Sequence, residues 1–372
     1  MSVRDLIIIG AGPSGLAAAI AAQRHGLDYQ VLEKGVLVNS IYRFPPQMVF
    51  FTTPELLEVG GLPFVSPYEK PTRAEALKYY RRVVDTFDLQ IAFDEAVESV
   101  EREDGGGSGG SDRSGRSDRS GGSGASGGEA HRVLAVATRS GKGVRRVRQA
   151  RNVVFAIGYY DRPVMIGVPG EDLPHVSHYY SEPHIHYRQR VVIVGGGNSA
   201  AESALEMFRA GAYVTVVHRA PQLKSTIKYW VRPDIENRIK EGSIAARFGA
   251  CVKEIRSSSV VIVSADGATD ERRMSNVERR TANVERATEE ELPADAVYLL
   301  TGYRADSDLM CRAGILLNER QAPVYDPQTF ETNVPGVFIA GGAIAGVDTG
   351  TIFIENGRFH GEKIVDVIVQ RQ

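Results

Sequence analysis

The chain has 372 residues, enough for two or three domains, and its 42% apolar and 24% charged residues are ordinary for a globular protein. The formal net charge of -2 lacks the basic excess that nucleic-acid binders and polybasic membrane-surface proteins need. The two cysteines, Cys251 and Cys311, are sixty residues apart, which excludes a CxxC pair, a zinc ribbon and a disulfide framework and suits a reducing cytosol.

The chain opens with a βαβ pattern. A strand is predicted over Asp5–Ile9, a helix over Leu16–His25 and a second strand over Tyr29–Glu33. The apolar stretch Leu6–Ala22 nearly has the length of a membrane span, but three glycines and Pro13 interrupt it. Since no basic start, apolar core and cleavage site precede it, we expect a cytoplasmic protein with no targeting segment.

The turn after the first strand reads Gly10-Ala11-Gly12-Pro13-Ser14-Gly15. In such a turn the first glycine permits the tight bend, the second lets the backbone approach a pyrophosphate and the third lets the helix pack closely. Glu33 stands eighteen residues after Gly15, where a carboxylate accepts ribose hydroxyls and repels a 2′-phosphate. The motif therefore predicts a site for FAD or NAD; a plain glycine turn would leave Glu33 unexplained.

An amphipathic helix is predicted over residues 74–88. Residues 105–128 are almost wholly Gly, Ser, Asp and Arg, so they cannot offset their ordering entropy and are expected to form a mobile loop. Strand-like pieces at 96–102 and 132–138 place this loop at the tip of a hairpin. An RNA-contacting role for its RSDRS repeat is the weaker alternative.

A second βαβ pattern repeats the first. A strand is predicted over Val191–Val194, a helix over Ser199–Ala210 and a strand over Tyr213–His218. The turn reads Gly195-Gly196-Gly197-Asn198-Ser199-Ala200, and its last residue is still small enough for close helix packing. The chain thus carries two nucleotide-binding openings.

Cationic residues follow the second strand of this unit. His218 and Arg219 stand where an acid would mark NAD, and Lys224 comes shortly after. Cations there pair with a 2′-phosphate, so we predict NADPH, with a solvated strand end as the alternative. Glu202 is a candidate neighbour of the nicotinamide, although the helix dipole also favours an acid near a helix start.

Two apolar strands, Val153–Gly158 and Val297–Gly302, end in small-residue turns and are natural crossings between domains. They predict a discontinuous FAD-binding domain of residues 1–162 plus 293–372, with an NADPH-binding domain inserted at 163–292.

The rest of the chain contains a charged segment and, after it, further predicted strands and a helix. The charged patch from 270 to 291 is expected to be a solvated loop or a short helical excursion. Strands are predicted at 296–300 and 336–340, and a single helix at 351–369.

The paired glycine turns, the two crossings and Val217-His218-Arg219 resemble the low-molecular-weight thioredoxin reductase-like flavoproteins, over the whole chain except its two low-complexity segments. Five strings more narrowly resemble the YpdA-type bacillithiol disulfide reductases. They are Ser40–Pro45, Phe50–Thr53, Lys70–Arg73, Ile227–Trp230 and Ile352–Arg358. The resemblance implies an α/β fold with two Rossmann-like FAD- and NAD(P)-binding domains, and a homodimer.

The chain departs from these families at its thiols. His178–Pro183 stands where a thioredoxin reductase carries CxxC, and Ser14 stands where the bacillithiol branch typically has a cysteine. A serine hydroxyl is too weakly acidic to replace a thiolate in disulfide exchange. The resemblance to the bacillithiol branch also implies that Gly342 replaces a flavin-ribitol aspartate of the thioredoxin reductases. We therefore expect no enzyme dithiol, with Cys251 and Cys311 buried as small apolar groups.

The predicted function is a FAD-dependent NADPH oxidoreductase that passes a hydride to flavin and then to an acceptor, such as a low-molecular-weight disulfide or a small redox protein. Flavin N5 is the reactive centre, and no side chain is predicted to be catalytic. Phe44 and Met48 are predicted to line the flavin ring, although ordinary core packing would explain these two residues equally well.

The residues predicted at FAD are Gly10, Gly12, Pro13, Ser14, Gly15, Glu33, Lys34, Ser40, Ile41, Phe44, Met48, Ala156, Gly158, Gly341 and Thr351. Those predicted at NADPH are Gly195, Gly197, Asn198, Ser199, Ala200, Glu202, His218, Arg219 and Lys224. No metal, nucleic acid or membrane partner is expected.

Three alternatives stay open. A flavin monooxygenase also carries two glycine turns, but Asp172 and Pro174 break its FxGxxxHxxx(W/Y) string. A redox sensor would hold FAD and report by conformation. A ferredoxin or flavodoxin reductase would need a basic docking patch, for which the candidates are Arg145, Arg146, Arg148 and Arg151.

Overall fold

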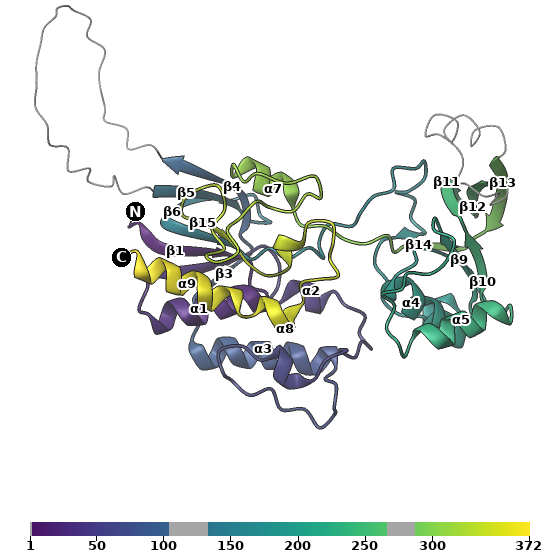
Figure 1. Cartoon of the computed structure of the whole chain (residues 1–372), viewed down its shortest axis with the longest axis horizontal. Coiled ribbons are helices and arrows are strands. Elements are labelled where there is room, and N and C mark those ends of the chain that lie inside the picture. Colours follow the sequence, from purple (N-terminus) through teal and green to yellow (C-terminus); the bar gives the residue numbers. More distant parts are fainter. Residues whose placement is uncertain (1, 104–132, 266–286) are drawn as a thin grey trace, which may run out of the picture. The chain divides into compact units, whose positions relative to one another are not determined.

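The computed structural model describes residues 2–103, 133–265 and 287–372. The loop expected at 105–128 and most of the charged patch at 270–291 lie outside these residues. The chain divides into two compact units (Figure 1). The first comprises Met1–Arg43, Val49–Arg162 and Arg304–Gln372, and the second comprises Phe44–Met48 and Pro163–Tyr303.

The first unit is built on one sheet with the strand order β3-β2-β1-β6-β5-β4, in which β15 also pairs with β6. The parallel part contains β1 (Arg4–Ile9), β2 (Tyr29–Glu33), β3 (Ile91–Phe93) and β15 (Val337–Ile339). The long strand β6 (Arg145–Phe155) joins this part to an antiparallel hairpin of β4 (Ala96–Glu103) and β5 (Val133–Arg139). Leu6, Ile7 and Ile8 of the central strand are completely buried, as a strand covered on both faces requires.

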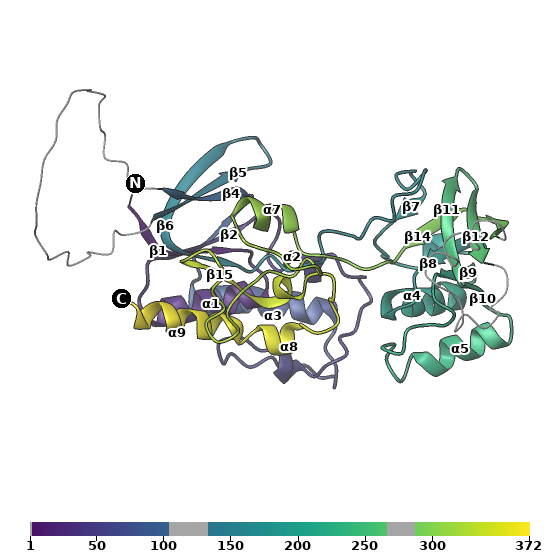
Figure 2. The same ribbon diagram turned by 45° about the horizontal axis from the view of Figure 1, so that its top comes forward.

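Helices α1 (Pro13–Arg24) and α9 (His360–Gln370) lie side by side along this sheet (Figure 2). They pack closely because Gly361 has no side chain: a Cβ there would lie 2.4 Å from the backbone nitrogen of Ala18. Helix α3 (Arg73–Phe87) begins with a capping box between Thr72 and Glu75. The shorter helices are α2 (Asn39–Tyr42), η1 (Pro54–Leu57), α7 (Ser307–Arg312), η4 (Gly341–Ala345) and α8 (Ile354–Gly357).

The helix predicted at 351–369 is wrong as a single element, because the chain forms α8 and α9 with a break between them. At the break, Nη1 of Arg358 donates to the carbonyl oxygens of Glu55 and Glu58. These two hydrogen bonds connect the end of α8 to η1. Gly357 ends α8 against Gly341, where a Cβ would lie 3.2 Å from the Gly341 Cα. These long-range contacts replace a continuous helix.

The second unit has a parallel sheet with the order β10-β9-β8-β14-β7 and a separate antiparallel sheet with the order β11-β12-β13. The parallel strands are β7 (Val176–Ser177), β8 (Arg190–Val194), β9 (Tyr213–His218), β10 (Ala245–Phe248) and β14 (Ala296–Leu299). The antiparallel strands are β11 (Ala250–Arg256), β12 (Ser259–Ala265) and β13 (Ala287–Pro293). Helices α4 (Asn198–Arg209) and α5 (Arg232–Lys240) complete the unit, while η2 (His184–His186) is a single turn.

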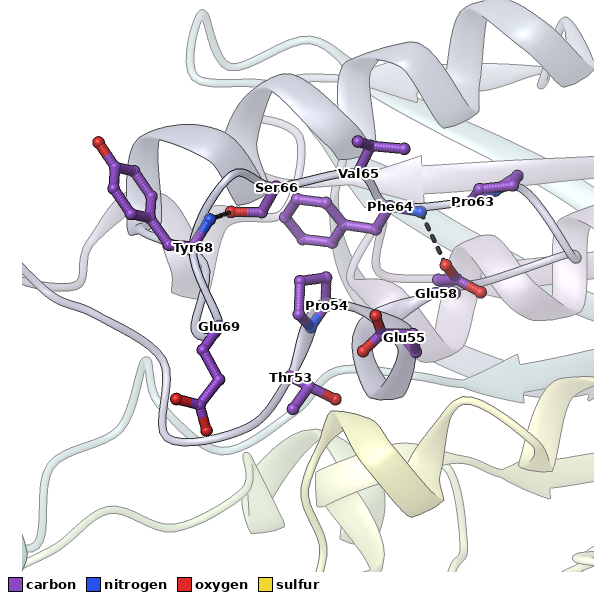
Figure 3. Close-up of a pocket in the computed structure, with 10 residues that line it drawn as sticks. All are labelled: Thr53, Pro54, Glu55, Glu58, Pro63, Phe64, Val65, Ser66, Tyr68 and Glu69. Atoms are coloured by element: carbon purple, nitrogen blue, oxygen red, sulfur yellow. Dashed lines mark hydrogen bonds between the residues drawn. The ribbon is translucent and has the colours of Figure 1, made fainter.

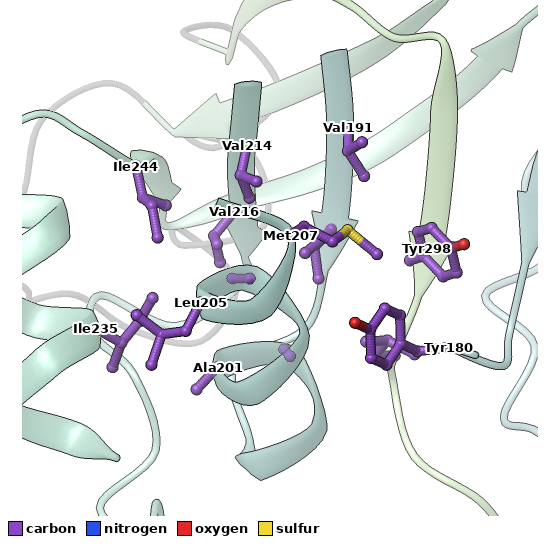
Figure 4. Packing of buried hydrophobic residues seen from close by; sticks show 14 of the residues in the cluster. Tyr180, Val191, Ala201, Leu205, Met207, Val214, Val216, Ile235, Ile244 and Tyr298 are labelled. Atoms are coloured by element: carbon purple, nitrogen blue, oxygen red, sulfur yellow. The ribbon is translucent and has the colours of Figure 1, made fainter. Parts of the chain in front are cut away.

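The core of the second unit lies between α4 and the parallel sheet (Figure 4). Leu205 and Met207 of α4 pack among Val191, Val214 and Ile235, which come from two strands and α5. The small residues Ala200, Ala201 and Ala204 let the helix approach the strands.

Two sequence-based boundaries need correction. The second boundary between the units lies between Tyr303 and Arg304, just after the predicted crossing Val297–Gly302, and not at 292/293, because β14 pairs with β8 inside the second unit. The end of the charged patch is a strand and not a loop: Glu289, Glu290 and Glu291 lie in β13 and pair with cations of the second unit.

Among the described residues, no helix has the length and apolar character that crossing a bilayer requires. The same part of the chain contains no group of three or more His, Cys, Asp or Glu side chains arranged to hold a metal ion.

Candidate functional site

The first glycine turn connects β1 to α1, and close approach of backbone fixes two of its glycines. Gly10 has φ of +107°, and a Cβ there would lie 2.5 Å from the carbonyl oxygen of Ala156. A Cβ on Gly15 would lie 2.0 Å from the carbonyl oxygen of Gly10. Gly12, in contrast, faces open space within 4 Å. The turn therefore leaves room for a ligand at Gly12, in front of the first turn of α1, where the amides after Pro13 have no acceptor within the helix.

Glu33 lies at this turn as the sequence predicts, at the end of β2. Its side chain is 5% exposed. Oε2 accepts a hydrogen bond from the Ala11 amide and Oε1 from the Gly35 amide, both at 2.8 Å. Burial raises the pKa of the carboxyl, and these two amides oppose the rise. Each oxygen keeps a further lone pair for a ribose hydroxyl.

Several other predicted FAD residues lie near the same turn. Ala156 contacts Gly10, and Gly158 lies beside Ser40, whose Oγ is 4.0 Å from the Cβ position of that glycine. Ile41 is buried in α2. Lys34 is paired with Asp161 at 2.8 Å.

A second corner faces the start of α1. Gly341 has φ of +65°, and a Cβ on it would lie 2.4 Å from Oγ of Ser14. The Gly341 amide donates to Nδ1 of His360 at 3.1 Å, and the ring of His360 stacks on Phe330. Burial, and then the charge of Lys363, lower the pKa of His360 to about 4. Gly341 and Ser14 thus meet, as a shared flavin site requires, and His360 is a residue that sequence reasoning missed.

Three predicted FAD residues are not joined to this cluster. Phe44 and Met48 fall in the second compact unit. Thr351 is exposed and donates from Oγ1 to the Asp348 carbonyl at 3.2 Å. Their places beside a flavin stay predictions.

The second glycine turn connects β8 to α4. A Cβ on Gly195 would lie 2.5 Å from the carbonyl oxygen of Leu300 and 3.1 Å from the Cβ of Ala200. The ring of His218 covers Gly196, with three ring atoms within 2.5 Å of a Cβ position there. The turn therefore repeats the close packing of the first.

His218 does not have the character that the sequence predicts for it. The side chain is 7% exposed, and Nε2 has no hydrogen-bond partner in the described structure. Burial, followed by the charges of Lys224 and Arg219, lowers its pKa, so the ring is neutral near pH 7. The sequence groups His218 with Arg219 and Lys224 as cations, and for His218 this prediction is wrong. Arg219 and Lys224 are exposed cations, whereas His218 is a buried neutral ring.

Glu202 of α4 has a partner that sequence reasoning missed. Its Oε1 accepts from Nζ of Lys228 at 2.6 Å. The Lys228 amide also donates to Oδ1 of Asn198 at 2.9 Å, and Nδ2 of Asn198 donates to the Thr226 carbonyl. The Ile227–Trp230 string is therefore fastened to the second glycine turn.

The segment that replaces a redox CxxC forms polar contacts. Tyr180 donates from its hydroxyl to Oε2 of Glu206 at 2.6 Å, and Gln47 donates to the same oxygen at 2.9 Å. Burial and the charge of Glu206 raise the pKa of Tyr180. Nε2 of His178 lies 3.4 Å from Oε1 of Glu171.

The prediction that both cysteines are buried is wrong. Cys251 and Cys311 are free and exposed. The alternation of β11 turns Cys251 to solvent, and α7 buries Leu309 and Met310 in preference to Cys311. The two thiols lie in different units.

A pocket of about 390 Å³ lies in the first unit between η1 and the loop that follows it (Figure 3). Its wall includes Phe64 and the carboxylates Glu55, Glu58 and Glu69, and the Phe64 amide donates to Oε1 of Glu58 at 2.8 Å. None of its lining residues comes from a glycine turn, and its carboxylates would repel a phosphate. The pocket is therefore separate from the predicted nucleotide sites.

Comparison with known proteins agrees with this arrangement. Residues 7–108 and 135–341 match the family model described as pyridine nucleotide-disulphide oxidoreductase. The sequence is 35% identical to bacilliredoxin reductase Bdr of Bacillus subtilis over 98% of both chains. The structure matches bacillithiol disulfide reductase Bdr (YpdA) of Bacillus cereus with a TM-score of 0.84, at 35% identity and over the whole of both chains. Thioredoxin reductase of T. acidophilum shares the fold, with a TM-score of 0.68 at 20% identity over 100% of this chain and 99% of that one.

Proposed function

The chain belongs to the pyridine nucleotide-disulphide oxidoreductase family, and on that premise we propose that it uses NADPH to reduce a low-molecular-weight disulfide, with bacillithiol disulfide as the first candidate. As a member of this family it is a flavoprotein oxidoreductase with FAD and NADPH as its cofactors. The observation that carries the acceptor is the likeness to the Bdr proteins, which extends over nearly the whole of each chain.

The residues of the first unit fit FAD. The free space at Gly12 and the amides at the start of α1 suit a pyrophosphate, and the lone pairs of Glu33 suit the adenosine ribose. Ser14 and Gly341 close the other side of the same turn. When bound, FAD supplies the two-electron chemistry between NADPH and the acceptor, and this chain binds it, orients it and excludes water.

The second glycine turn supports NADPH as the donor. Arg219 and Lys224 are exposed cations near the end of β9, and both are available to a 2′-phosphate. The Lys224 amide donates to the Gly196 carbonyl at 2.9 Å, which holds the lysine beside the turn. The neutral ring of His218 fills the space above Gly196, so two cations and not three select the coenzyme.

We further propose that no enzyme thiol relays the electrons. Ser14 is the residue at the glycine turn, and the exposed Cys251 and Cys311 lie in different units and far apart in the sequence. A serine hydroxyl cannot form the mixed disulfide on which thiol exchange depends. The acceptor would therefore meet the reduced cofactor directly.

An acceptor panel tests the proposal. The protein is reduced with NADPH under anaerobic conditions, and flavin reoxidation is followed by stopped flow with bacillithiol disulfide, glutathione disulfide, ferredoxin, flavodoxin, quinone and oxygen. Bacillithiol disulfide is expected to reoxidise the flavin fastest. If neither disulfide reoxidises the flavin faster than oxygen does, the proposal of a low-molecular-weight disulfide as the acceptor is overturned. Preparations that stay colourless after reconstitution with FAD would contradict the assignment of this chain as a flavin-binding protein.

The ferredoxin reductase alternative loses part of its support from the sequence. The four arginines that were to form a basic docking patch share three carboxylates, one of which also pairs with Arg139, so only part of their positive charge is balanced. The pairs are Arg145 with Glu98, Arg146 and Arg148 with Glu95, and Arg151 with Asp5.

A further inference from the structure

Two side chains from distant parts of the first unit cover the Gly341–Gly342 corner. A Cβ on Gly341 would lie 2.4 Å from Oγ of Ser14. A Cβ on Gly342 would lie 2.7 and 2.8 Å from Cδ1 and Cε1 of Tyr159. The space that side chains at 341 and 342 would need is therefore taken by Ser14, from the start of α1, and by Tyr159, from beyond the end of β6.

The backbone places Tyr159 at this corner. β6 ends at Phe155, next to Ile9 of β1, so the chain leaves the sheet at the same edge as the first glycine turn. Gly158 then bends it with φ of +60°. Tyr159 follows immediately and turns its ring to Gly342. The carboxyl edge of parallel strands is where ligands bind in sheets of this type.

The hydroxyl of Tyr159 differs from those of three other enclosed tyrosines, which are hydrogen-bonded within the protein. Tyr79, Tyr80 and Tyr180 donate to Leu62, Leu57 and Glu206, respectively, at 2.6–2.9 Å. Tyr159, although largely enclosed, has no hydrogen bond from its hydroxyl to any described residue, and neither has Oγ of Ser14. The hydroxyl is not one of the fully buried, unpaired polar atoms of the described structure, so it remains open to a hydrogen-bond partner on a ligand held at this edge of the sheet.

We propose that Tyr159 is a flavin-binding residue whose phenol donates a hydrogen bond to FAD held at the first glycine turn. The inference rests on the proposed function, because it needs FAD at that turn. The ring fixes the corner by packing on Gly342, and the hydroxyl selects a ligand with an acceptor beside it. Burial and the nearby charge of Glu355 raise the pKa of the phenol, so it stays protonated and can donate.

The test compares Tyr159→Phe with the matched control Tyr325→Phe. Tyr325 also lies in the first unit, is partly buried, packs on Phe330 and makes no hydroxyl hydrogen bond to a described residue. Both changes delete one hydroxyl and keep the ring. FAD is removed and titrated back, and its dissociation constant, the visible flavin spectrum and the reduction potential are measured.

Tyr159→Phe is expected to keep its melting temperature without FAD, to weaken FAD binding by about tenfold and to shift the flavin spectrum. Tyr325→Phe should match wild type in all three flavin measurements. The inference is overturned if Tyr159→Phe also matches wild type, or if both variants lose FAD equally. Wild-type protein that fails to bind FAD would instead refute the proposed function, so the two failures are distinguishable.

Discussion

His360 makes the stability of the first unit sensitive to acid. The Gly341 amide donates to its Nδ1 at 3.1 Å, so that nitrogen must be unprotonated. The residue is 8% exposed, and its ring lies 4.5 Å from the ring of Phe330. Protonation would place a buried charge on a ring that has lost its hydrogen bond. This is why burial and Lys363 lower the pKa to about 4.

The magnitude follows from the difference between the folded and unfolded states. The ordinary pKa is 6.5 and the folded value about 4, a gap of about 2.5 units, or about 3 kcal/mol at 1.36 kcal/mol per unit. Because the unfolded chain takes up the proton first, the free energy of unfolding falls as pH drops from about 6.5 to about 4 and levels off below. The full contribution is present above about pH 6.5.

Denaturant unfolding across this pH range, with wild type and His360→Asn, measures the effect. Asparagine keeps an acceptor for the Gly341 amide but does not titrate, so the variant should lose about 3 kcal/mol less between about pH 6.5 and about pH 4. His184→Asn changes an exposed imidazole and should keep the wild-type slope. Identical slopes for wild type and His360→Asn would refute the reasoning.

Three further predictions concern the two glycine turns. Gly15→Ala places a Cβ 2.0 Å from the Gly10 carbonyl and should cost about 1–3 kcal/mol in denaturant unfolding, whereas Gly12→Ala, which faces open space, should leave apoprotein stability unchanged. Arg219→Ala or Lys224→Ala should each raise the KM for NADPH about tenfold and leave that for NADH unchanged; equal changes for both coenzymes in steady-state assays would contradict the assignment. Ser14→Cys should raise disulfide reductase activity by on the order of tenfold over Ser14→Ala, and equal rates would show that a thiol at this position is not what limits turnover.

The local elements could be predicted because their causes are local. Tyr29–Glu33 and Tyr213–His218 are strands with the predicted bounds, since apolar alternation and flanking glycines define them. Gly10 and Gly15 lie against backbone as the turn motif requires. Glu33 reaches the turn because β2 pairs in register with β1.

The errors arise where a residue's environment depends on distant chain. β14 looks like a strand of either unit, and only its pairing with β8 assigns it to the second. The C-terminal helical pattern gives no sign that Arg358 binds carbonyls some three hundred residues earlier in the sequence. Cys251 and Cys311 have the small apolar character of core residues, but the faces of β11 and α7 that carry them are exposed.

Glycine has two different uses in these turns, and only one of them is visible in the motif. Gly10 and Gly195 have positive φ, which favours glycine through its backbone. Gly196 and Gly342 do not have positive φ; each is instead covered by a ring, His218 in one unit and Tyr159 in the other, where a Cβ would stand. The absence of a side chain at 196 leaves room for the buried ring of His218. The absence of one at 342 gives Tyr159 its place at the first glycine turn. In both units a glycine thus decides the chemistry of a residue that is distant from it in the sequence.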